Sequence, residues 1–292
     1  MPVDDRARLV LGTAALGLPY GLPRDGQTRP QLVAEDEALA LLRMAQQQGV
    51  GALDTAPAYG VAEERIGSSG VVLPVWTKLA LGIDPVVSVG ASLVTLRRPQ
   101  LDLVQWHNWT AATADDPAFR AAWRALGRDG RVAGLGASTY GVADALAAAQ
   151  SGLFAVVQVE YNLLNQGVVE AIAAAAAAQR VSIAVRSVLL QGVLTEREDG
   201  LPPSLAALEP ARQRAQDQAD AHGVPLSVLA IRAALDHPAI SWVLLGADTP
   251  SQLEMALATC DLDPLPPASR QALAALDIGP TLTDPRTWPR PA

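Results

Sequence analysis

The chain has 292 residues, of which 50% are hydrophobic and 18% are charged, and its formal net charge at pH 7 is −8. This composition supports a large buried core and excludes an intrinsically disordered chain. The acidic balance argues against nucleic acid or an anionic membrane surface as the main partner.

The sequence predicts a soluble, cytoplasmic protein with no membrane association. Residues 1–6 include two acids and no apolar stretch, so we expect no signal peptide. The alanine-rich stretch that begins at Ala171 is too short to cross a bilayer. A single cysteine, Cys260, excludes an internal disulfide and suits a reducing compartment.

Short apolar runs alternate with helix-forming stretches along the whole chain. Strands are predicted at 8–11, 51–53, 74–77, 101–105, 132–135, 155–159, 181–185 and 240–245. Helices are predicted at 32–48, 62–66, 85–96, 116–126, 142–149, 168–179, 204–221, 225–236 and 251–259.

Eight strand–helix units with no linker between them predict an α/β fold, a single-domain (β/α)₈ TIM barrel over residues 1–292. A doubly wound parallel sheet is the alternative. It is disfavoured because no predicted strand is followed by the Gly-x-Gly-x-x-Gly pattern that binds dinucleotides in such sheets.

Polar residues stand where the predicted strands end. In an α/β barrel these strand ends converge on the face that carries the active site. The residues at or near such positions are Asp54, Lys78, His107, Ser138, Gln158, Arg186 and Gly246, and Tyr59 follows in the loop after the second strand.

Four of these residue types suit carbonyl reduction. A tyrosine with a pKa of about 10 is a weak acid at neutral pH, and a neighbouring lysine lowers that pKa by stabilising the phenolate. A carboxylate keeps the lysine charged, and a neutral histidine can hydrogen-bond to the carbonyl oxygen. Each residue alone also has a structural explanation, such as a helix cap for Asp54 or a buried ion pair for Lys78.

The chain resembles the aldo-keto reductase family over essentially its whole length. The stretches that carry the resemblance are Leu11-Gly12-Thr13-Ala14, Asp54-Thr55-Ala56-Pro57-Ala58-Tyr59-Gly60, Glu64-Arg65-Ile66-Gly67, Trp76-Thr77-Lys78, Gln105-Trp106-His107, Gly134-Leu135-Gly136-Ala137-Ser138, Gln158-Val159-Glu160-Tyr161-Asn162 and Leu244-Leu245-Gly246-Ala247. The resemblance implies an NAD(P)(H)-dependent oxidoreductase in which Tyr59 is the general acid, Lys78 and Asp54 tune it, and His107 orients the carbonyl. No metal site is expected.

The resemblance also implies a cofactor site. The residues that it places there are Gly12, Thr13, Ala14, Ser138, Gln158, Arg186, Ser187, Leu189, Gln191, Gly246, Ala247, Asp248, Gln252 and Met255. Family members usually carry an aromatic residue at the position of Arg186, where it stacks on the nicotinamide. Arg186 can stack there through its guanidinium plane or contact the substrate. Thr139 replaces a common asparagine.

The choice between NAD and NADP stays open, with a slight preference for NAD. Family habit favours NADP, but residues 244–258 contain no lysine or arginine to hold a 2′-phosphate. Asp248 would repel that phosphate, bind the ribose 2′-hydroxyl, or only cap the following helix.

The substrate is expected to be a small-molecule carbonyl compound or alcohol. Four aromatic residues in loops are predicted at the barrel mouth, where they would contact a sugar or an apolar carbonyl compound, or pack loop against loop: Tyr20, Trp106, Trp109 and Tyr140. We expect a monomer or a weak oligomer. Two other functions stay open. One is a nucleotide-binding sensor or regulatory barrel with little turnover. The other is a lyase or epimerase, which Arg186 supports because it stands where the family usually has the aromatic residue that stacks on the nicotinamide.

Overall fold

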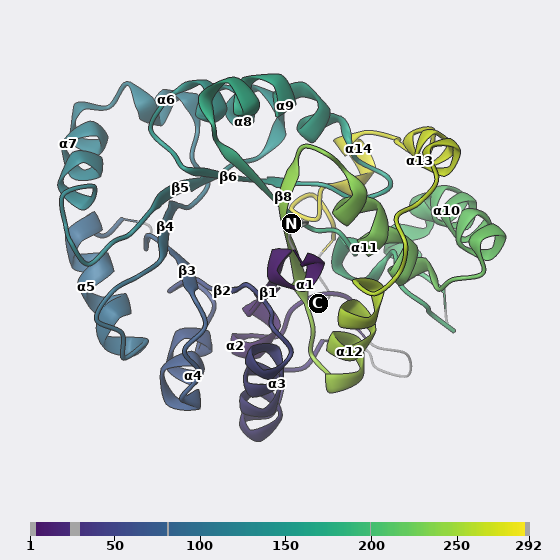
Figure 1. The fold of residues 1–292 in the computed structure, drawn as a ribbon, viewed down its shortest axis with the longest axis horizontal. Coiled ribbons are helices and arrows are strands. Elements are labelled where there is room, and N and C mark those ends of the chain that lie inside the picture. The colour runs from purple at the N-terminus through teal and green to yellow at the C-terminus, as the bar shows by residue number, and fades with distance from the viewer. Residues whose placement is uncertain (1–3, 24–29, 81, 199, 290–292) are drawn as a thin grey trace.

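The computed structural model describes residues 4–23, 30–80, 82–198 and 200–289. Its centre is a closed barrel of eight parallel strands, each hydrogen-bonded to the next in chain order (Figure 1). The strands are β1 Leu9–Gly12, β2 Ala52–Asp54, β3 Val75–Lys78, β4 Leu103–Trp106, β5 Leu135–Ser138, β6 Val156–Glu160, β7 Ser182–Arg186 and β8 Ile240–Gly246. The predicted (β/α)₈ fold class is therefore confirmed.

The predicted fifth strand is wrong in position. The strand is not 132–135 but begins at Leu135, which pairs with Val104, while Val132 forms only an isolated bridge with Leu101. A side chain at Gly136 would lie 2.9 Å from the Val156 carbonyl oxygen, so the close strand spacing requires glycine there. The segment has a low strand propensity, so the sequence did not predict a strand there. It is a strand because it pairs with both neighbouring strands.

Nine helices match the predicted helical stretches to within a few residues at either end: α3 Glu35–Gln47, α4 Ala62–Ser69, α5 Pro85–Thr95, α7 Pro117–Leu126, α8 Gly141–Gln150, α9 Gly167–Gln179, α10 Glu209–His222, α11 Leu226–Asp236 and α12 Pro250–Thr259. A 3₁₀ helix, Pro203–Leu208, precedes α10. The sequence did not predict α1 Asp5–Arg8, α2 Ala14–Gly17, α6 Ala111–Ala114, α13 Pro267–Ala274 or α14 Pro280–Thr283. Helices of four residues are too short to carry a periodic pattern.

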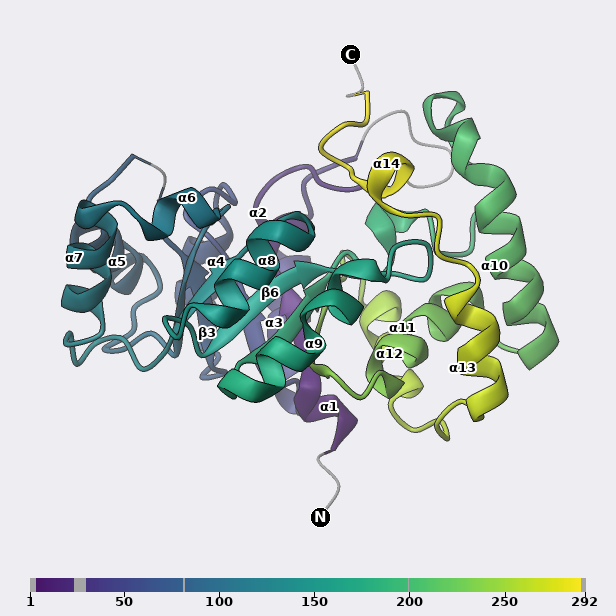
Figure 2. The ribbon, with the colours of Figure 1, turned by 90° about the horizontal axis from the view of Figure 1, so that it is seen from above.

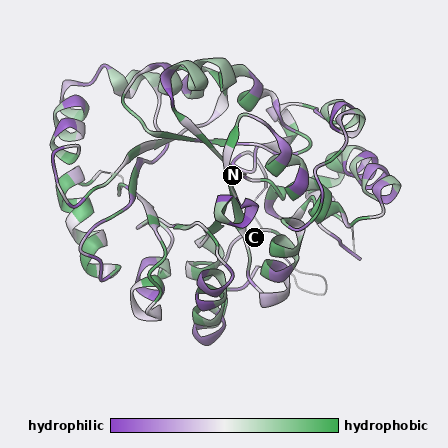
Figure 3. Cartoon of the chain, viewed as in Figure 1, coloured by the Kyte–Doolittle hydropathy of each residue, from purple (hydrophilic) through white to green (hydrophobic). Residues whose placement is uncertain are grey.

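The hydrophobic core has two parts. The larger lies between the strands and the surrounding helices, and hydrophilic residues gather on outer helices such as α3 and α10 (Figure 3). The smaller fills the barrel interior and consists of Val10, Ala52, Trp76, Leu103, Val156, Ala184 and Leu244, with Trp242 packed against them. None of the helices in the described ranges combines the length and hydrophobicity that a membrane-spanning helix needs.

The two ends of the barrel are covered by different parts of the chain. Helix α1 lies at the end where the strands begin, and α14 lies at the opposite end, where the strands finish (Figure 2). Arg8 donates a hydrogen bond to the Ile240 carbonyl at 2.9 Å, and Asp5 forms an ion pair with Arg232 at 2.7 Å. These contacts hold the N-terminal helix α1 against β8 and α11. The C-terminal segment covers the opposite end of the barrel (Figure 2).

Two glycines in contact fix the loop that follows β2. Gly60 has a positive φ of 57°, and a side chain there would overlap the Gly17 carbonyl oxygen. A side chain at Gly17 would overlap the Tyr59 carbonyl oxygen, and the Gly17 carbonyl accepts a hydrogen bond from the Val61 amide at 3.2 Å. The backbone position of Tyr59 therefore depends on the absence of a side chain at Gly17.

We predict that Gly17→Ala lowers the free energy of unfolding by about 1–3 kcal/mol, because the new methyl group forces the loop at Tyr59 to move. The measurement is urea denaturation. Gly90→Ala is the matched control, since Gly90 lies inside α5 with nothing within 4 Å of the added methyl group. That change should raise stability by about 0.5–1 kcal/mol through helix propensity. Equal effects of the two substitutions would contradict the proposed contact.

Candidate active site

The site forms one layer above the hydrophobic residues that fill the barrel. Successive side chains of a strand point to opposite faces, so a residue two positions after an inward-pointing residue also points inward. Ala52 and Trp76 fill the interior, and Asp54 and Lys78 stand two positions after them. By the same spacing the layer also contains Gly12, Gln105, Ser138, Gln158, Arg186 and Gly246.

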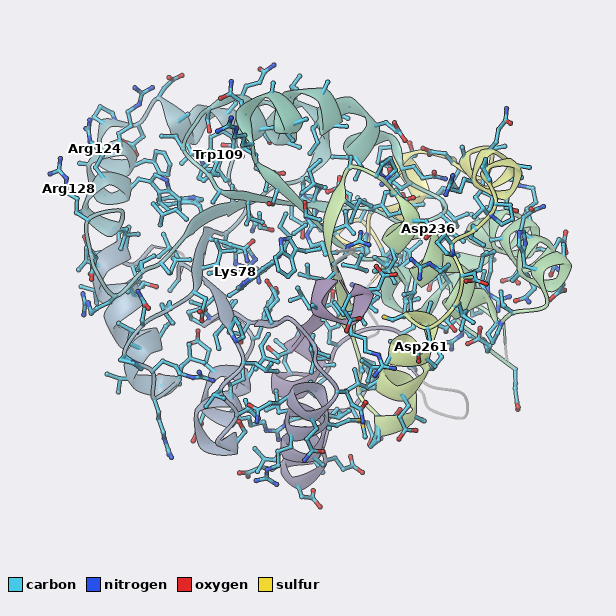
Figure 4. All side chains as sticks on the ribbon, in the orientation of Figure 1. Lys78, Trp109, Arg124, Arg128, Asp236 and Asp261 are labelled. Carbon is cyan, nitrogen blue, oxygen red and sulfur yellow. The ribbon has the colours of Figure 1, made fainter. Side chains whose placement is uncertain are left out.

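A buried ion pair occupies the centre of this layer. Lys78 lies inside the barrel (Figure 4). Its Nζ is 2.6 Å from Asp54 Oδ2, and the two side chains are only 1% and 5% exposed. The ammonium also donates to the Thr55 carbonyl at 2.9 Å. The other carboxylate oxygen, Asp54 Oδ1, accepts hydrogen bonds from the amides of Gln105 at 3.1 Å and Gln158 at 2.9 Å. Both charges are therefore paired and hydrogen-bonded, as a buried pair requires.

Tyr59 lies directly against the lysine. Its ring centroid is 4.8 Å from Lys78 Nζ, and the ring is half-buried. Burial lowers the pKa of Lys78, but the charges and hydrogen bonds of Asp54 and Tyr59 outweigh it, so the net pKa of Lys78 is raised. The side chain is consequently an ammonium at neutral pH and faces the tyrosine.

His107 follows the last residue of β4 and faces the same tyrosine. The two ring centroids are 6.4 Å apart and the ring planes are at 88°. Burial, and then the positive charge of Lys78, lower the pKa of His107 to about 4. The imidazole is therefore neutral at pH 7, with one nitrogen able to donate and the other able to accept a hydrogen bond. The structure brings together all four residues predicted for the chemistry.

A cavity of about 410 Å³ runs from Tyr59 to α12. Of the fourteen residues predicted to hold the cofactor, all except Ser138 line it: Gly12, Thr13, Ala14, Gln158, Arg186, Ser187, Leu189, Gln191, Gly246, Ala247, Asp248, Gln252 and Met255. Ser138 lies behind Gln158 and donates a hydrogen bond to its side-chain oxygen at 3.3 Å. Sequence reasoning thus identified one continuous surface from residues far apart in the chain.

The wall of this cavity includes exposed backbone and residues at the start of α12. Gly12 and Gly246 bring backbone to its wall without side chains, and a side chain at Gly246 would meet nothing within 4 Å. At the far end Thr249 caps α12 by accepting from the Gln252 amide, and the Asp248 amide donates to the Gln252 side chain at 2.9 Å. Within the described residues, no cluster of histidine, cysteine or acidic side chains is arranged to hold a metal ion.

The structure adds two residues that sequence reasoning missed. Gln105 holds Asp54, and its position two residues after Leu103 in β4 was the signal that could have revealed it. Arg197 lines the cavity from the segment after β7, where its side chain donates to the carbonyls of Gly200 and Pro23. The cavity therefore contains a base that residues 244–258 lack.

Arg186 points into the barrel mouth from the end of β7. Its guanidinium donates to the Thr139 carbonyl at 2.6 Å, and its central carbon lies 4.0 Å from the ring centroid of Tyr140. Glu160 lies 3.6 Å from the same terminal nitrogen. The arginine is part of the cavity wall and is not turned into bulk solvent.

The four aromatic residues predicted at the mouth have different surroundings. Tyr20 is 46% exposed and lines the cavity, and Tyr140 packs against Arg186. Trp106 is half-buried and packs edge to face against Phe119 at 4.7 Å. The prediction for Trp109 is wrong: it is 1% exposed and packs between the strands and the helices, as Figure 4 shows.

A comparison with protein families decides the identity of this arrangement. The family described as "Aldo/keto reductase family" matches residues 85–278, two thirds of the chain. The chain belongs to the aldo/keto reductase family. It is therefore an NAD(P)H-dependent oxidoreductase that acts on small-molecule carbonyl compounds. Asp54, Tyr59 and Lys78 precede the matched residues. Their place in the site therefore rests on the distances given above and not on the family match.

Solved structures share this reductase's fold. A glycerol dehydrogenase from Gluconobacter oxydans is 22% identical, with a TM-score of 0.73, and the comparison covers 92% of this chain and 90% of that one. An aldo-keto reductase from Bacillus halodurans in its holo form is 21% identical, with a TM-score of 0.72 and 92% of both chains covered. No curated protein matches the sequence.

The lowered pKa of His107 predicts a pH dependence of stability. Its folded-state pKa is about 4 and its ordinary value is 6.5, so the unfolded chain binds more protons between these values. The contribution of His107 to the free energy of unfolding should therefore fall as pH decreases from 6.5 to 4. Relative to His107→Asn, the wild type should lose on the order of 2–3 kcal/mol between pH 7 and pH 4 in denaturant titrations. Parallel curves for the two proteins would contradict this.

Proposed function

We propose that this reductase converts an aldehyde or ketone to an alcohol, with Tyr59 as the general acid. The observation that carries the proposal is the charged Lys78, paired with Asp54 at 2.6 Å and lying 4.8 Å from the Tyr59 ring centroid. A cation at this position stabilises the phenolate that remains after proton donation. A tyrosine without such a neighbour is a poor acid at neutral pH.

The side chains of the site then have distinct tasks. When bound, the nicotinamide supplies a hydride to the carbonyl carbon. Tyr59 gives its hydroxyl proton to the carbonyl oxygen, and Lys78 stabilises the resulting phenolate. Asp54 keeps Lys78 charged in a site where burial lowers the pKa of the lysine.

His107 completes the site by donating a hydrogen bond to the carbonyl oxygen. It can do so as a neutral group, because its pKa is about 4. A neutral donor orients the carbonyl and stabilises the negative charge that develops on the oxygen. It also adds no second positive charge beside Lys78.

Cofactor binding is assigned along the cavity. The nicotinamide carboxamide would meet Ser138 and Gln158, which are already hydrogen-bonded to each other. The pyrophosphate would lie under the residues after β7, and the adenosine would lie at the start of α12. The residues proposed for these two parts are Ser187, Leu189 and Gln191, and Gly246, Ala247, Gln252 and Met255.

The role of Tyr59 as proton donor is tested by a substitution that removes only its hydroxyl group. Tyr59→Phe should lower kcat for aldehyde reduction by about 10²–10⁴-fold, because the general acid is lost, while NAD(P)H binding stays within about twofold. The measurement is loss of NAD(P)H absorbance with a panel of aldehydes, ketones and aldoses.

Tyr161→Phe is the matched control for that substitution. Tyr161 is buried, packs on His237 at 5.6 Å between ring centroids and lies outside the cavity lining. This variant should keep full activity. Retained turnover in Tyr59→Phe would eliminate Tyr59 as the acid. Cofactor binding by the wild type without turnover of any carbonyl would instead favour a sensor, and redox-neutral conversion of a sugar would favour an epimerase or lyase.

We propose further that NAD(H) binds more tightly than NADP(H). Residues 244–258 include the acids Asp248 and Glu254 and no base, and of these two acids Asp248 lines the cavity at the end proposed for the adenosine. A 2′-phosphate carries close to two negative charges and normally requires a basic partner. Two bases among the described residues line the cavity elsewhere, Arg186 and Arg197, and Arg197 is the candidate that would oppose this preference.

Titration of NADH and NADPH, followed by fluorescence quenching, tests the preference. In the wild type, NADPH should bind about 1–3 kcal/mol more weakly, because its extra phosphate would meet the carboxylate of Asp248 in the cavity wall and no base of residues 244–258. Asp248→Asn should narrow the gap without changing NADH binding. Tighter NADPH binding in the wild type that is lost in Arg197→Met would reverse the assignment and identify Arg197 as the phosphate ligand.

A further inference from the structure

Arg186 has hydrogen-bonding capacity that the fold does not use. A guanidinium has five N–H donors. Only the Nη2 group is engaged, by the Thr139 carbonyl at 2.6 Å and, at 3.6 Å, by Glu160 Oε2. Nε and Nη1 make no hydrogen bond with any residue that the structure describes, although the side chain is only 16% exposed and lines the cavity. Three N–H donors of one cation are therefore available at the mouth.

A second arginine lies on the same aromatic ring. The central guanidinium carbons of Arg186 and Arg286 lie 4.0 and 3.6 Å from the ring centroid of Tyr140. Arg286 belongs to the segment after α14, which covers the end of the barrel where the strands finish (Figure 2). Asp284 binds Arg286 through Nε and Nη2 and leaves Nη1 without a hydrogen bond among the described residues. Stacking on one ring fixes the position of both cations.

The positive charge of Arg186 extends over the reaction site. Burial and Lys78 are the main causes of the lowered pKa of His107, and Arg186 lowers it further. Lys78 remains charged, but its charge is balanced by Asp54 at 2.6 Å and its side chain is 1% exposed. It therefore cannot bind a charged group of the substrate. Arg186 and Tyr59 both line the cavity, so Arg186 is a cation that an incoming substrate meets there.

Glu160 forms an ion pair with this cation but no hydrogen bond to it. Its Oε1 accepts from the Gly141 amide at 2.9 Å, at the start of α8, and its Oε2 lies 3.6 Å from Arg186, beyond hydrogen-bonding distance. The ion pair thus orients the guanidinium and leaves Nε and Nη1 without a hydrogen bond among the described residues. Each edge that can hold a carboxylate or phosphate with two parallel hydrogen bonds combines Nη2 with Nε or with Nη1. Thr139 takes only one of the two N–H groups of Nη2, so the other can take part in such an edge.

We propose that the natural substrate is an anionic carbonyl compound, whose carboxylate or phosphate binds the unused N–H groups of Arg186, with support from the positive charge of Arg286. This inference rests on the proposed reductase function and specifies its substrate class. The reaction is balanced by the hydride from the nicotinamide and the proton from Tyr59, and the anionic group takes no part in it. Its role is to bind the substrate and direct the carbonyl toward Tyr59 and His107.

The experiment compares acids with neutral amides of the same shape. Glyoxylate, succinate semialdehyde and 4-carboxybenzaldehyde are each paired with the corresponding amide, and glyceraldehyde 3-phosphate is paired with glyceraldehyde. In the wild type, kcat/KM should favour the anion in at least one pair by about 10- to 100-fold, the scale of one or two charge-assisted hydrogen bonds. Arg186→Met should abolish that ratio by raising KM for the anion much more than KM for the neutral partner.

Arg286→Met is the second variant, and it should lower the ratio by a smaller factor, about two- to fivefold. The chain provides a matched control in Arg131→Met. Arg131 pairs with Asp129 through the same three contacts, at 2.9, 3.2 and 2.6 Å, by which Arg286 pairs with Asp284, but it lies before β5, at the other end of the barrel. Arg131→Met should leave the ratio unchanged.

Several outcomes would overturn the inference. One is equal use of anion and amide by the wild type in all pairs. Another is an unchanged ratio in Arg186→Met, which would leave Arg186 only a structural link to Thr139. A third is an equal loss for both partners with weaker NAD(P)H binding, which would assign Arg186 to the nicotinamide.

Calorimetry separates this inference from the reductase proposal. Binding of 4-carboxybenzyl alcohol and its amide is measured with the cofactor present, in the wild type and in Arg186→Met. Tighter binding of the acid that depends on Arg186, without turnover of any aldehyde, would uphold the anion site and reject the reductase function. Turnover of aldehydes with no discrimination in binding or rate would uphold the function and reject the anion site.

Discussion

The buried contact between Lys78 and Asp54 is the constraint on which the rest of the site depends. An ammonium that is 1% exposed would cost several kcal/mol without its carboxylate partner. Asp54 in turn requires the amides of Gln105 and Gln158, which saturate its second oxygen. Residues of β2, β3, β4 and β6 therefore converge on one carboxylate. Closure of the barrel brings these four strands to one point. The fold is therefore what keeps Lys78 charged beside Tyr59.

The same geometry gives the site a packed side, toward the barrel interior, and an open side, toward the cavity. Beneath it, Trp76 and Trp242 pack edge to face at 5.1 Å and fill the barrel interior. Above it, the glycine at position 246 leaves space along the wall of the cavity. The functional layer thus rests on a packed support that fixes Lys78, while the ligand approaches from the end that the C-terminal segment covers. Rigid placement of charge before the substrate arrives is what electrostatic stabilisation of a transition state requires.

Prediction from the sequence succeeded where strand ends determine position and failed where a loop reverses direction. Asp54 and Lys78 are the last residues of their strands, so local periodicity was enough to place them at one end of the barrel. Trp109 follows Asn108, whose φ of 56° turns the chain back. The Trp109 amide then donates to the Ser138 carbonyl at 2.9 Å, and its ring packs on Phe154 in the core. Nothing in the local sequence marks that reversal.

The sequence by itself determined the alternation of strands and helices and the residues at most strand ends, because both follow from short-range hydrophobic periodicity. Only the tertiary structure decided which distant groups meet. Arg286 reaches Tyr140, and Arg197 reaches the cavity, through segments whose course depends on packing against the finished barrel. The start of β5 at Leu135 was likewise decided by pairing with β4 and β6. Contacts between residues far apart in the chain arise from closure of the barrel, and local propensity carries no information about them.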